Sequence, residues 1–243
     1  GGSYTMYDGT VWRVITTAPT GETTLVGAGM YAGNSAALDL TRALLNGNSA
    51  TVDLAYGGGI FVDTGSSLYA TAVNISANSV GETGGSAGGG GIYTAGATTL
   101  VNATIAKNTA SARDAAGGGM FLASGATFTG NNLAFAYNAA TGTVSGEGDF
   151  VTCDSATLDI TYSNLWDGDS VSGTCSGSYD FASGTNLMVE PLFADTSGAD
   201  PAFWDLHLGA GSPLIDVGDV ALLDVDGSRS DVGAYGGPNG SWP

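Results

Sequence analysis

Basic residues are nearly absent from this 243-residue chain. It has five lysines and arginines in total, with Lys107 the only lysine, against 23 aspartates and glutamates. The resulting net charge of −18 repels the phosphates of nucleic acids and the surface of anionic membranes. It also repels acidic polysaccharides unless divalent cations bridge the two. We therefore expect no nucleic-acid partner.

Long apolar stretches are also absent. No segment reaches the roughly 18 consecutive apolar residues of a membrane-spanning helix, so membrane insertion is not expected. No signal peptide is recognisable and the chain begins at Gly1 rather than Met, which predicts a processed product or a piece of a longer protein. The single histidine, His207, lies in a strand-like run. We expect it to pack or to face solvent rather than to bind zinc or serve in a Ser-His-Asp triad.

Cysteine is limited to Cys153 and Cys175. In a reducing compartment the two would be buried free thiols. In an acidic, glycine-rich chain built from repeats, we expect a disulfide and a secreted protein. The bond would close a loop of roughly 20 residues, which the chain-entropy model values at about 3 kcal/mol.

Glycine, by contrast, is abundant, with 41 residues arranged in a repeat. Glycine-rich openings occur at residues 27–31, 57–61, 89–93, 117–121 and, less clearly, 146–150. Four asparagines follow at a constant step of thirty residues: Asn48, Asn78, Asn108 and Asn138. A fixed period of this length is typical of a solenoid, because one repeat cannot bury its own apolar face and must stack on its neighbours.

Within each repeat the pattern is that of β-strands. Apolar and small residues alternate at a spacing of two, and turn-forming residues interrupt every run within about ten residues. Short strands stacked turn on turn make an all-β parallel β-helix of roughly eight rungs, about 4.8 Å apart. We divide this single domain into a first rung (1–26), regular repeats (27–150) and irregular last rungs with a C-terminal cap (151–243).

The periodic asparagines have a structural interpretation. A column of asparagines can pass side-chain hydrogen bonds along a solenoid and can tolerate the left-handed backbone that corners require. We therefore interpret Asn48, Asn78, Asn108 and Asn138 as a ladder that is buried or placed at a corner. The alternative is an exposed row of asparagines that binds a ligand.

Two motifs carry a resemblance to a known family. The repeats open with Gly-Gly-Gly-Ile or Gly-Gly-Gly-Met and end with Ile or Phe three residues before the asparagine. The tail contains Glu190-Pro191-Leu192-Phe193, then Gly211-Ser212-Pro213-Leu214-Ile215-Asp216, then Asp224-Val225-Asp226-Gly227-Ser228-Arg229-Ser230-Asp231-Val232-Gly233-Ala234-Tyr235. Together these resemble secreted bacterial right-handed parallel β-helix proteins, including those with polymorphic outer-membrane-protein repeats. The resemblance implies a single-stranded right-handed β-helix on a bacterial surface, in a family of adhesins, surface proteins and polysaccharide-active enzymes.

Acidic residues in the tail could bind a metal ion. Asp224, Asp226, Ser228 and Asp231 place three carboxylates and a hydroxyl around a glycine turn. Oxygen ligands of this kind suit calcium, although the glycine spacing is not that of an EF-hand. The alternative is an ordinary Asp-Gly turn in which Arg229 satisfies one carboxylate.

The sequence gives little support for catalysis, and we assign no catalytic residue. β-Helix lyases need a basic residue near acid-bound calcium, and hydrolases need converging carboxylates. The pairs Glu147/Asp149 and Asp167/Asp169 have strand spacing of about 7 Å, within the range of an inverting glycosidase. Two acids in a loop are more often a solvated edge, and we expect that here.

Three functions remain. The favoured one is an extracellular structural or cell-surface module that self-associates head to tail into a filament or sheath, or that continues into neighbouring domains of a longer chain. The second is an adhesin that binds glycans through an exposed aromatic row. That row would comprise Tyr4, Tyr7, Trp12, Tyr31, Tyr56, Tyr69 and Tyr93. The third is a polysaccharide lyase or hydrolase.

Overall fold

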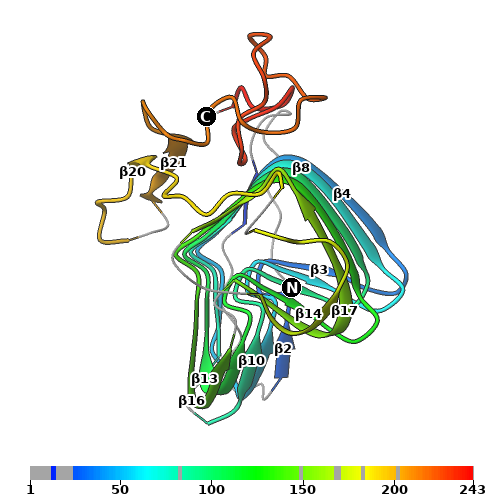
Figure 1. Cartoon of the computed structure of the whole chain (residues 1–243). Coiled ribbons are helices and arrows are strands. Elements are labelled where there is room, and N and C mark those ends of the chain that lie inside the picture. The colour runs from blue at the N-terminus through cyan, green and yellow to red at the C-terminus, as the bar shows by residue number, and fades with distance from the viewer. Residues whose placement is uncertain are drawn as a thin grey trace.

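The chain forms a parallel β-solenoid with an irregular C-terminal region along its side (Figure 1). A computed structural model describes residues 12–14, 24–81, 84–147, 150–166, 171–181, 184–200 and 203–242. For residues 12–14, 25 and 143–147, only the backbone is described. The predicted fold class, an all-β solenoid of stacked parallel strands, is confirmed.

Two parallel sheets form the walls of the solenoid. The first contains β1 (Trp12–Val14), β3 (Met30–Ala32), β4 (Ala37–Asn46), β7 (Ile60–Val62), β8 (Ser67–Ser76), β11 (Ile92–Thr94), β12 (Ala97–Ala106), β14 (Met120–Leu122), β15 (Thr127–Ala136), β17 (Val151–Thr161), β18 (Asn164–Trp166) and β19 (Val171–Ser176). The second contains β2 (Thr24–Val26), β5 (Ser49–Ala50), β6 (Leu54–Tyr56), β9 (Ser79–Val80), β10 (Ser86–Gly88), β13 (Thr109–Ala116) and β16 (Ala139–Glu147). Outside the solenoid, β20 (Phe193–Asp195) and β21 (Asp205–Leu208) form an antiparallel pair.

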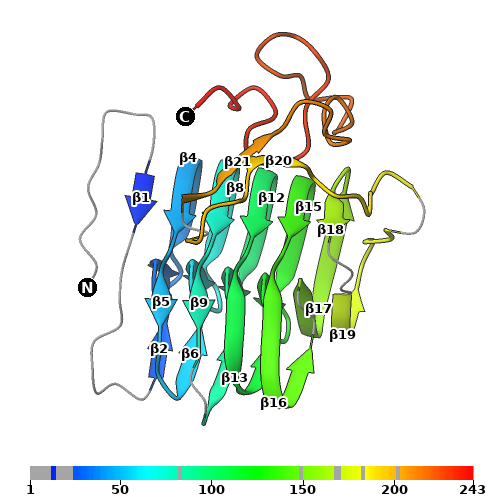
Figure 2. The same cartoon turned by 90° about the vertical axis from the view of Figure 1, so that its left-hand side faces the viewer.

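The long strands β4, β8, β12 and β15 stack in register with the thirty-residue period (Figure 2). Leu45, Ile75, Ile105 and Phe135 thereby lie one above another, each at most 1% exposed. Alternate residues of each strand point inward, so this stack and its neighbours form one continuous core.

The backbone turns two corners of each repeat in the left-handed region. One corner comprises Gly47, Ala77, Lys107 and Tyr137, the residues directly before the periodic asparagines, with φ between 55° and 68°. The other lies within the long strands at Arg42, Ala72, Asn102 and Asn132, and between β17 and β18 at Tyr162, with φ between 49° and 57°. Only one of these nine residues is glycine, so stacking contacts hold ordinary side chains in a conformation they normally avoid.

The C-terminal end of the core is covered by residues 171–181. Strand β19 pairs with β17, and Tyr179 and Phe181 pack against the core beside it. The chain then leaves the stack after Leu187, which bridges to Asn164.

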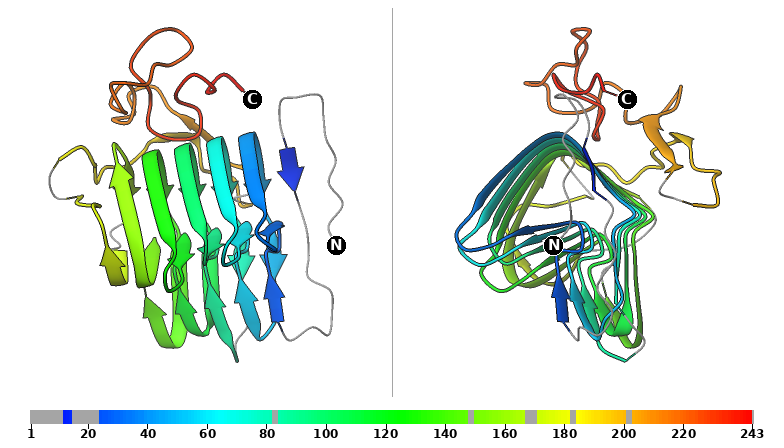
Figure 3. Two further views of the ribbon diagram at one scale, coloured as in Figure 1. Left: turned by 90° about the vertical axis from the view of Figure 1, so that its right-hand side faces the viewer. Right: turned by 180° about the vertical axis from the view of Figure 1, so that it is seen from behind.

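The remaining residues run back along the outside of the long strands toward β4 (Figures 2 and 3). The solenoid therefore has about four regular turns rather than the roughly eight expected, because the tail does not stack as further rungs. Leu214 and Val232 of the tail instead pack on the outward-facing Ala134 of β15.

Candidate functional site

The periodic asparagines form a buried hydrogen-bonded column. The backbone N–H and Nδ2 of Asn48 both donate to Oδ1 of Asn78, at 3.0 and 2.7 Å. Asn78 makes the same pair of bonds to Asn108, and Asn108 to Asn138, at 2.9 to 3.0 Å. The four residues are between 0 and 5% exposed, so their amides face one another and not a ligand.

The glycine openings pack against this column. A Cβ added to Gly91 would lie 3.0 Å from the side-chain amide of Asn108 and 2.6 Å from the carbonyl oxygen of Gly119. Gly29, Gly59 and Gly119 meet the other ladder asparagines in the same way. The two repeated features of the sequence are therefore one contact, in which glycine provides the space that the asparagine fills.

A second column consists of aromatic rings. Tyr31, Phe61, Tyr93 and Phe121 follow the glycine openings and stack with centroids 5.6, 4.8 and 5.2 Å apart and interplanar angles of 18°, 1° and 7°. The faces of the inner rings are thus covered by neighbouring rings, and only their edges are available to a ligand. Phe61 and Phe121 were not in the predicted glycan-binding row, although they hold the same position in the repeat as Tyr31 and Tyr93.

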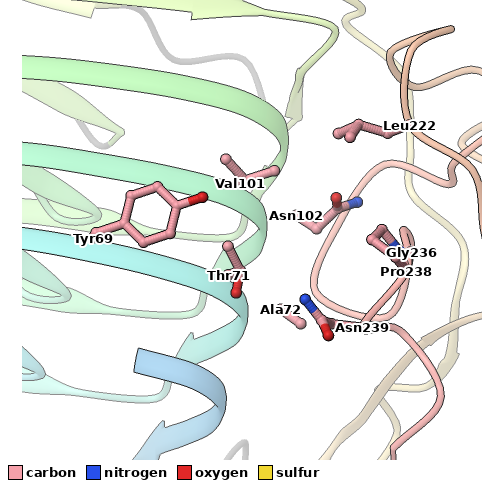
Figure 4. A pocket seen from close by; sticks show the side chains of 9 residues that line it. All are labelled: Tyr69, Thr71, Ala72, Val101, Asn102, Leu222, Gly236, Pro238 and Asn239. Atoms are coloured by element: carbon pink, nitrogen blue, oxygen red, sulfur yellow. The ribbon is translucent and has the colours of Figure 1, made fainter. Parts of the chain in front are cut away.

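The other tyrosines of that row do not form one surface with the column. Tyr56 lies at a tilt beside Tyr93, 5.2 Å between centroids. Tyr69 lies on β8 and faces the tail (Figure 4). Tyr4, Tyr7 and the side chain of Trp12 lie outside the described residues.

Cys153 and Cys175 form a disulfide, as predicted. The bond joins β17 to β19, the strand that covers the end of the core. It links residues 22 positions apart. A disulfide indicates folding in an oxidising environment.

Three tail carboxylates converge. Oxygen atoms of Asp216, Asp224 and Asp231 lie within 4.8 Å of one another. Asp231 N–H donates to Asp224 at 3.1 Å, and Asp216 N–H donates to Asp231 at 2.8 Å. Burial, followed by the charges of Asp224 and Asp216, raises the pKa of Asp231 to about 6, and burial also raises the pKa of Asp224.

This cluster differs from the four residues predicted to bind calcium. Asp224 and Asp231 belong to it, but Asp226 accepts hydrogen bonds from the backbone and hydroxyl of Ser228 within its own turn, at 2.9 and 2.6 Å. Asp216 takes its place and was missed, because it belongs to a separate tail motif. Arg229 donates to the carbonyls of Gly218 and Val217 and shapes the turn. Within the described chain, Asp216, Asp224 and Asp231 are the residues that could hold a divalent cation.

The two acidic pairs considered for hydrolysis are not described: Asp149, Asp167, Asp169 and the side chain of Glu147 lie outside the described residues. The environment of His207 is described. Its Nδ1 lies 2.6 Å from Asp205, and its ring stacks on Tyr235 with centroids 3.6 Å apart. Trp242 covers the other side of Tyr235 at 4.7 Å, so His207 packs within the tail.

Two corner asparagines fasten the tail to the solenoid. Nδ2 of Asn102 and Nδ2 of Asn132 both donate to Oγ of Ser230 at 3.0 Å. Asn102 also donates to the carbonyl of Asp231 at 3.0 Å, and Oδ1 of Asn132 accepts from the N–H of Asp219 at 2.7 Å. These asparagines are also thirty residues apart, so the sequence contains a second pair of asparagines with the same period, a signal that the sequence analysis missed.

A cleft of about 160 Å³ remains where the tail meets β8 and β12 (Figure 4). Tyr69 and Thr71 line it from β8, and Asn102 lines it from β12. Leu222, Pro238 and Asn239 of the tail form the opposite side. The cleft exists because the tail docks at this corner.

Comparison with known proteins adds no relative. No family model, curated protein or solved structure matches this chain. The chain is therefore classified by its architecture, as a parallel β-solenoid. Among the described residues, no helix has the length and apolar character needed to cross a bilayer.

Proposed function

We propose that this protein is an extracellular structural or cell-surface module from a bacterium. The observation that carries the proposal is the unbroken asparagine column, in which each of three successive Oδ1 atoms accepts two buried hydrogen bonds. Such a column, together with the aromatic stack, resists sliding between turns and makes the stack of turns rigid. The disulfide and the net charge of −18 suit a soluble surface outside the cytosol.

The resemblance to polymorphic outer-membrane-protein repeats supports the same proposal. The glycine openings and the asparagines that carry this resemblance are in contact in the structure, because each of the four openings at Gly29, Gly59, Gly91 and Gly119 packs on a ladder asparagine. The tail motif has its own place, docked on Asn102 and Asn132. Repeats and tail thus act as parts of one surface module.

Head-to-tail assembly into a filament is a finer form of the proposal. Strands at the ends of a parallel stack offer backbone groups of matching spacing to another copy or to a neighbouring domain. Tyr179 and Phe181 cover the C-terminal end of the core, which favours a module that is closed at this end. A second copy that stacked on the C-terminal end would meet Tyr179 and Phe181 rather than an open core.

Two measurements test the proposal. Immunogold labelling of thin sections of the source bacterium is expected to place the protein at the outer surface, and labelling confined to the cytoplasm would overturn the proposal. Negative-stain images of concentrated protein then address assembly. Separate compact particles of one chain would support the closed module, whereas filaments would support stacking.

A glycan-binding role through the predicted aromatic row is not favoured. A sugar stacks on the face of an aromatic ring, and the inner faces of the column are covered by rings at 4.8 to 5.6 Å. A polysaccharide lyase also lacks support at the carboxylate cluster, because the nearby Arg229 donates to two backbone carbonyls. Release of unsaturated or reducing-end products from a polysaccharide panel would reverse this view.

A further inference from the structure

The cleft between the solenoid and its tail combines an aromatic ring with uncharged polar groups. Tyr69 is 48% exposed on the outward face of the ten-residue strand β8. Thr71 contributes a hydroxyl, and Asn102 and Asn239 contribute amides, while Leu222 and Pro238 supply apolar surface (Figure 4). None of the residues that line the cleft is charged.

The two amides differ in what they offer. Nδ2 of Asn102 is engaged by the tail and the residue is only 3% exposed, so Asn102 offers a ligand no more than the edge of Oδ1. Within the described chain, no hydrogen bond engages the side chain of Asn239, so it can both donate and accept. The phenol of Tyr69 adds a further donor and acceptor. A ligand here meets the ring of Tyr69 on one wall and Leu222 and Pro238 on the other, with hydroxyl and amide groups beside them.

We propose that this cleft binds one neutral hexopyranose unit. A pyranose has C–H groups on its ring faces and hydroxyls around its edge, which match an aromatic wall with amides beside it. The volume of about 160 Å³ is below the roughly 300–1,000 Å³ typical of pockets for larger ligands, so it suits a single ring at the end of a glycan chain or on a branch.

The charge of the surroundings selects against acidic sugars. Asp224 accepts a hydrogen bond from the N–H of Gly237, the residue directly before Pro238 in the cleft wall. Asp216 and Asp231 cluster with Asp224. A uronic or sialic acid would bring a further negative charge toward this cluster, in a protein of net charge −18. The proposal thus gives the surface module a ligand, at a place other than the aromatic column.

The test is a binding measurement on the full chain. Saturation-transfer NMR and calorimetry would use methyl glycosides of glucose, galactose, mannose and N-acetylglucosamine, each neutral hexose being compared with its uronate where one exists. At least one neutral glycoside is expected to bind, and to bind about tenfold more weakly to Tyr69→Ala and to Asn239→Ala. Tyr31→Ala is the matched control, since it removes a tyrosine of similar exposure (46%) from another strand column.

Circular dichroism and hydrogen exchange over residues 214–234 would show that each variant keeps its fold and its docked tail. If no neutral glycoside binds, or if one binds equally well to the Tyr69→Ala/Asn239→Ala double variant, the cleft is not the sugar site. Equal binding of the uronates would overturn the selection for neutral sugars. Either result leaves the surface-module proposal standing, because localisation tests that proposal separately.

Discussion

Asn78 places two hydrogen bonds on a single atom of Asn108. Its backbone N–H and its Nδ2 lie 3.0 and 2.9 Å from Oδ1 of Asn108. Nδ2 of Asn78 also donates to the carbonyl of Leu45 at 2.9 Å, so one side chain connects three successive turns. Removing one asparagine therefore leaves several buried groups without partners.

Asn108→Ala is expected to lower the free energy of unfolding by about 3 kcal/mol or more. The backbone N–H and Nδ2 of Asn78 and the carbonyl of Ile75 all lose a partner, and each buried unsatisfied group costs about 1–3 kcal/mol. Urea unfolding followed by circular dichroism measures the change. Thr127→Ala on an exposed position of β15 is the control and should change stability by about 0.5 kcal/mol or less. Unchanged stability in Asn108→Ala would show that the asparagine column does not stabilise the fold.

The regular half of the fold could be predicted because its contacts have constant sequence separation. Leu45, Ile75 and Ile105 meet at intervals of thirty, and the same interval is visible in the sequence. The tail contacts carry no such signal. Asn102 reaches Ser230 across 128 residues, and only folding shows that the two are neighbours.

The disulfide is expected to stabilise the protein by about 3 kcal/mol. It closes a loop between positions 22 apart and so removes conformational freedom from the unfolded chain. Urea unfolding of the Cys153→Ala/Cys175→Ala variant measures this contribution, with Ala156→Gly in β17 as a control for general weakening of that strand. A thiol count that finds two free sulfhydryls in the unreduced protein would show that the bond does not form.

The calcium prediction made from the sequence remains a prediction, and the structure changes the residues that test it. If calcium binds, millimolar CaCl₂ should raise the melting temperature relative to EDTA, because it would relieve repulsion among Asp216, Asp224 and Asp231. Asp216→Asn should remove the increase, and Asp226→Asn should keep it, since Asp226 caps its own turn. A melting temperature that the chelator does not move excludes calcium.

Ala77→Gly is expected to stabilise the protein modestly, by about 0.5–1 kcal/mol. Ala77 has φ of 55° at the corner where the preceding turn has Gly47. A left-handed conformation costs a residue with a Cβ about 1–2 kcal/mol, and part of the gain is lost to the greater freedom of glycine in the unfolded chain. Ala103→Gly, at a buried strand position, is the control and should destabilise. Thermal unfolding of both variants decides whether the corner stores strain.

The docking of the tail is expected to weaken as the pH rises from about 4 to about 7. The folded-state pKa of Asp231, about 6, lies above its ordinary value of 3.8, so folding favours the protonated carboxyl. The stability contributed by this group is fully present below the ordinary pKa and is lost as the pH passes through about 6. Asp224, whose pKa is also raised, acts in the same direction.

Hydrogen exchange over residues 214–234 should therefore be slower at pH 4.5 than at pH 7.5, once corrected for intrinsic exchange rates. Asp231→Asn keeps the acceptor for the N–H of Asp216 and should flatten the dependence. Asp226→Asn should not, because the hydrogen bonds from Ser228 lower the pKa of Asp226. If the wild-type tail is equally protected from hydrogen exchange at pH 4.5 and pH 7.5, Asp231 does not govern its docking.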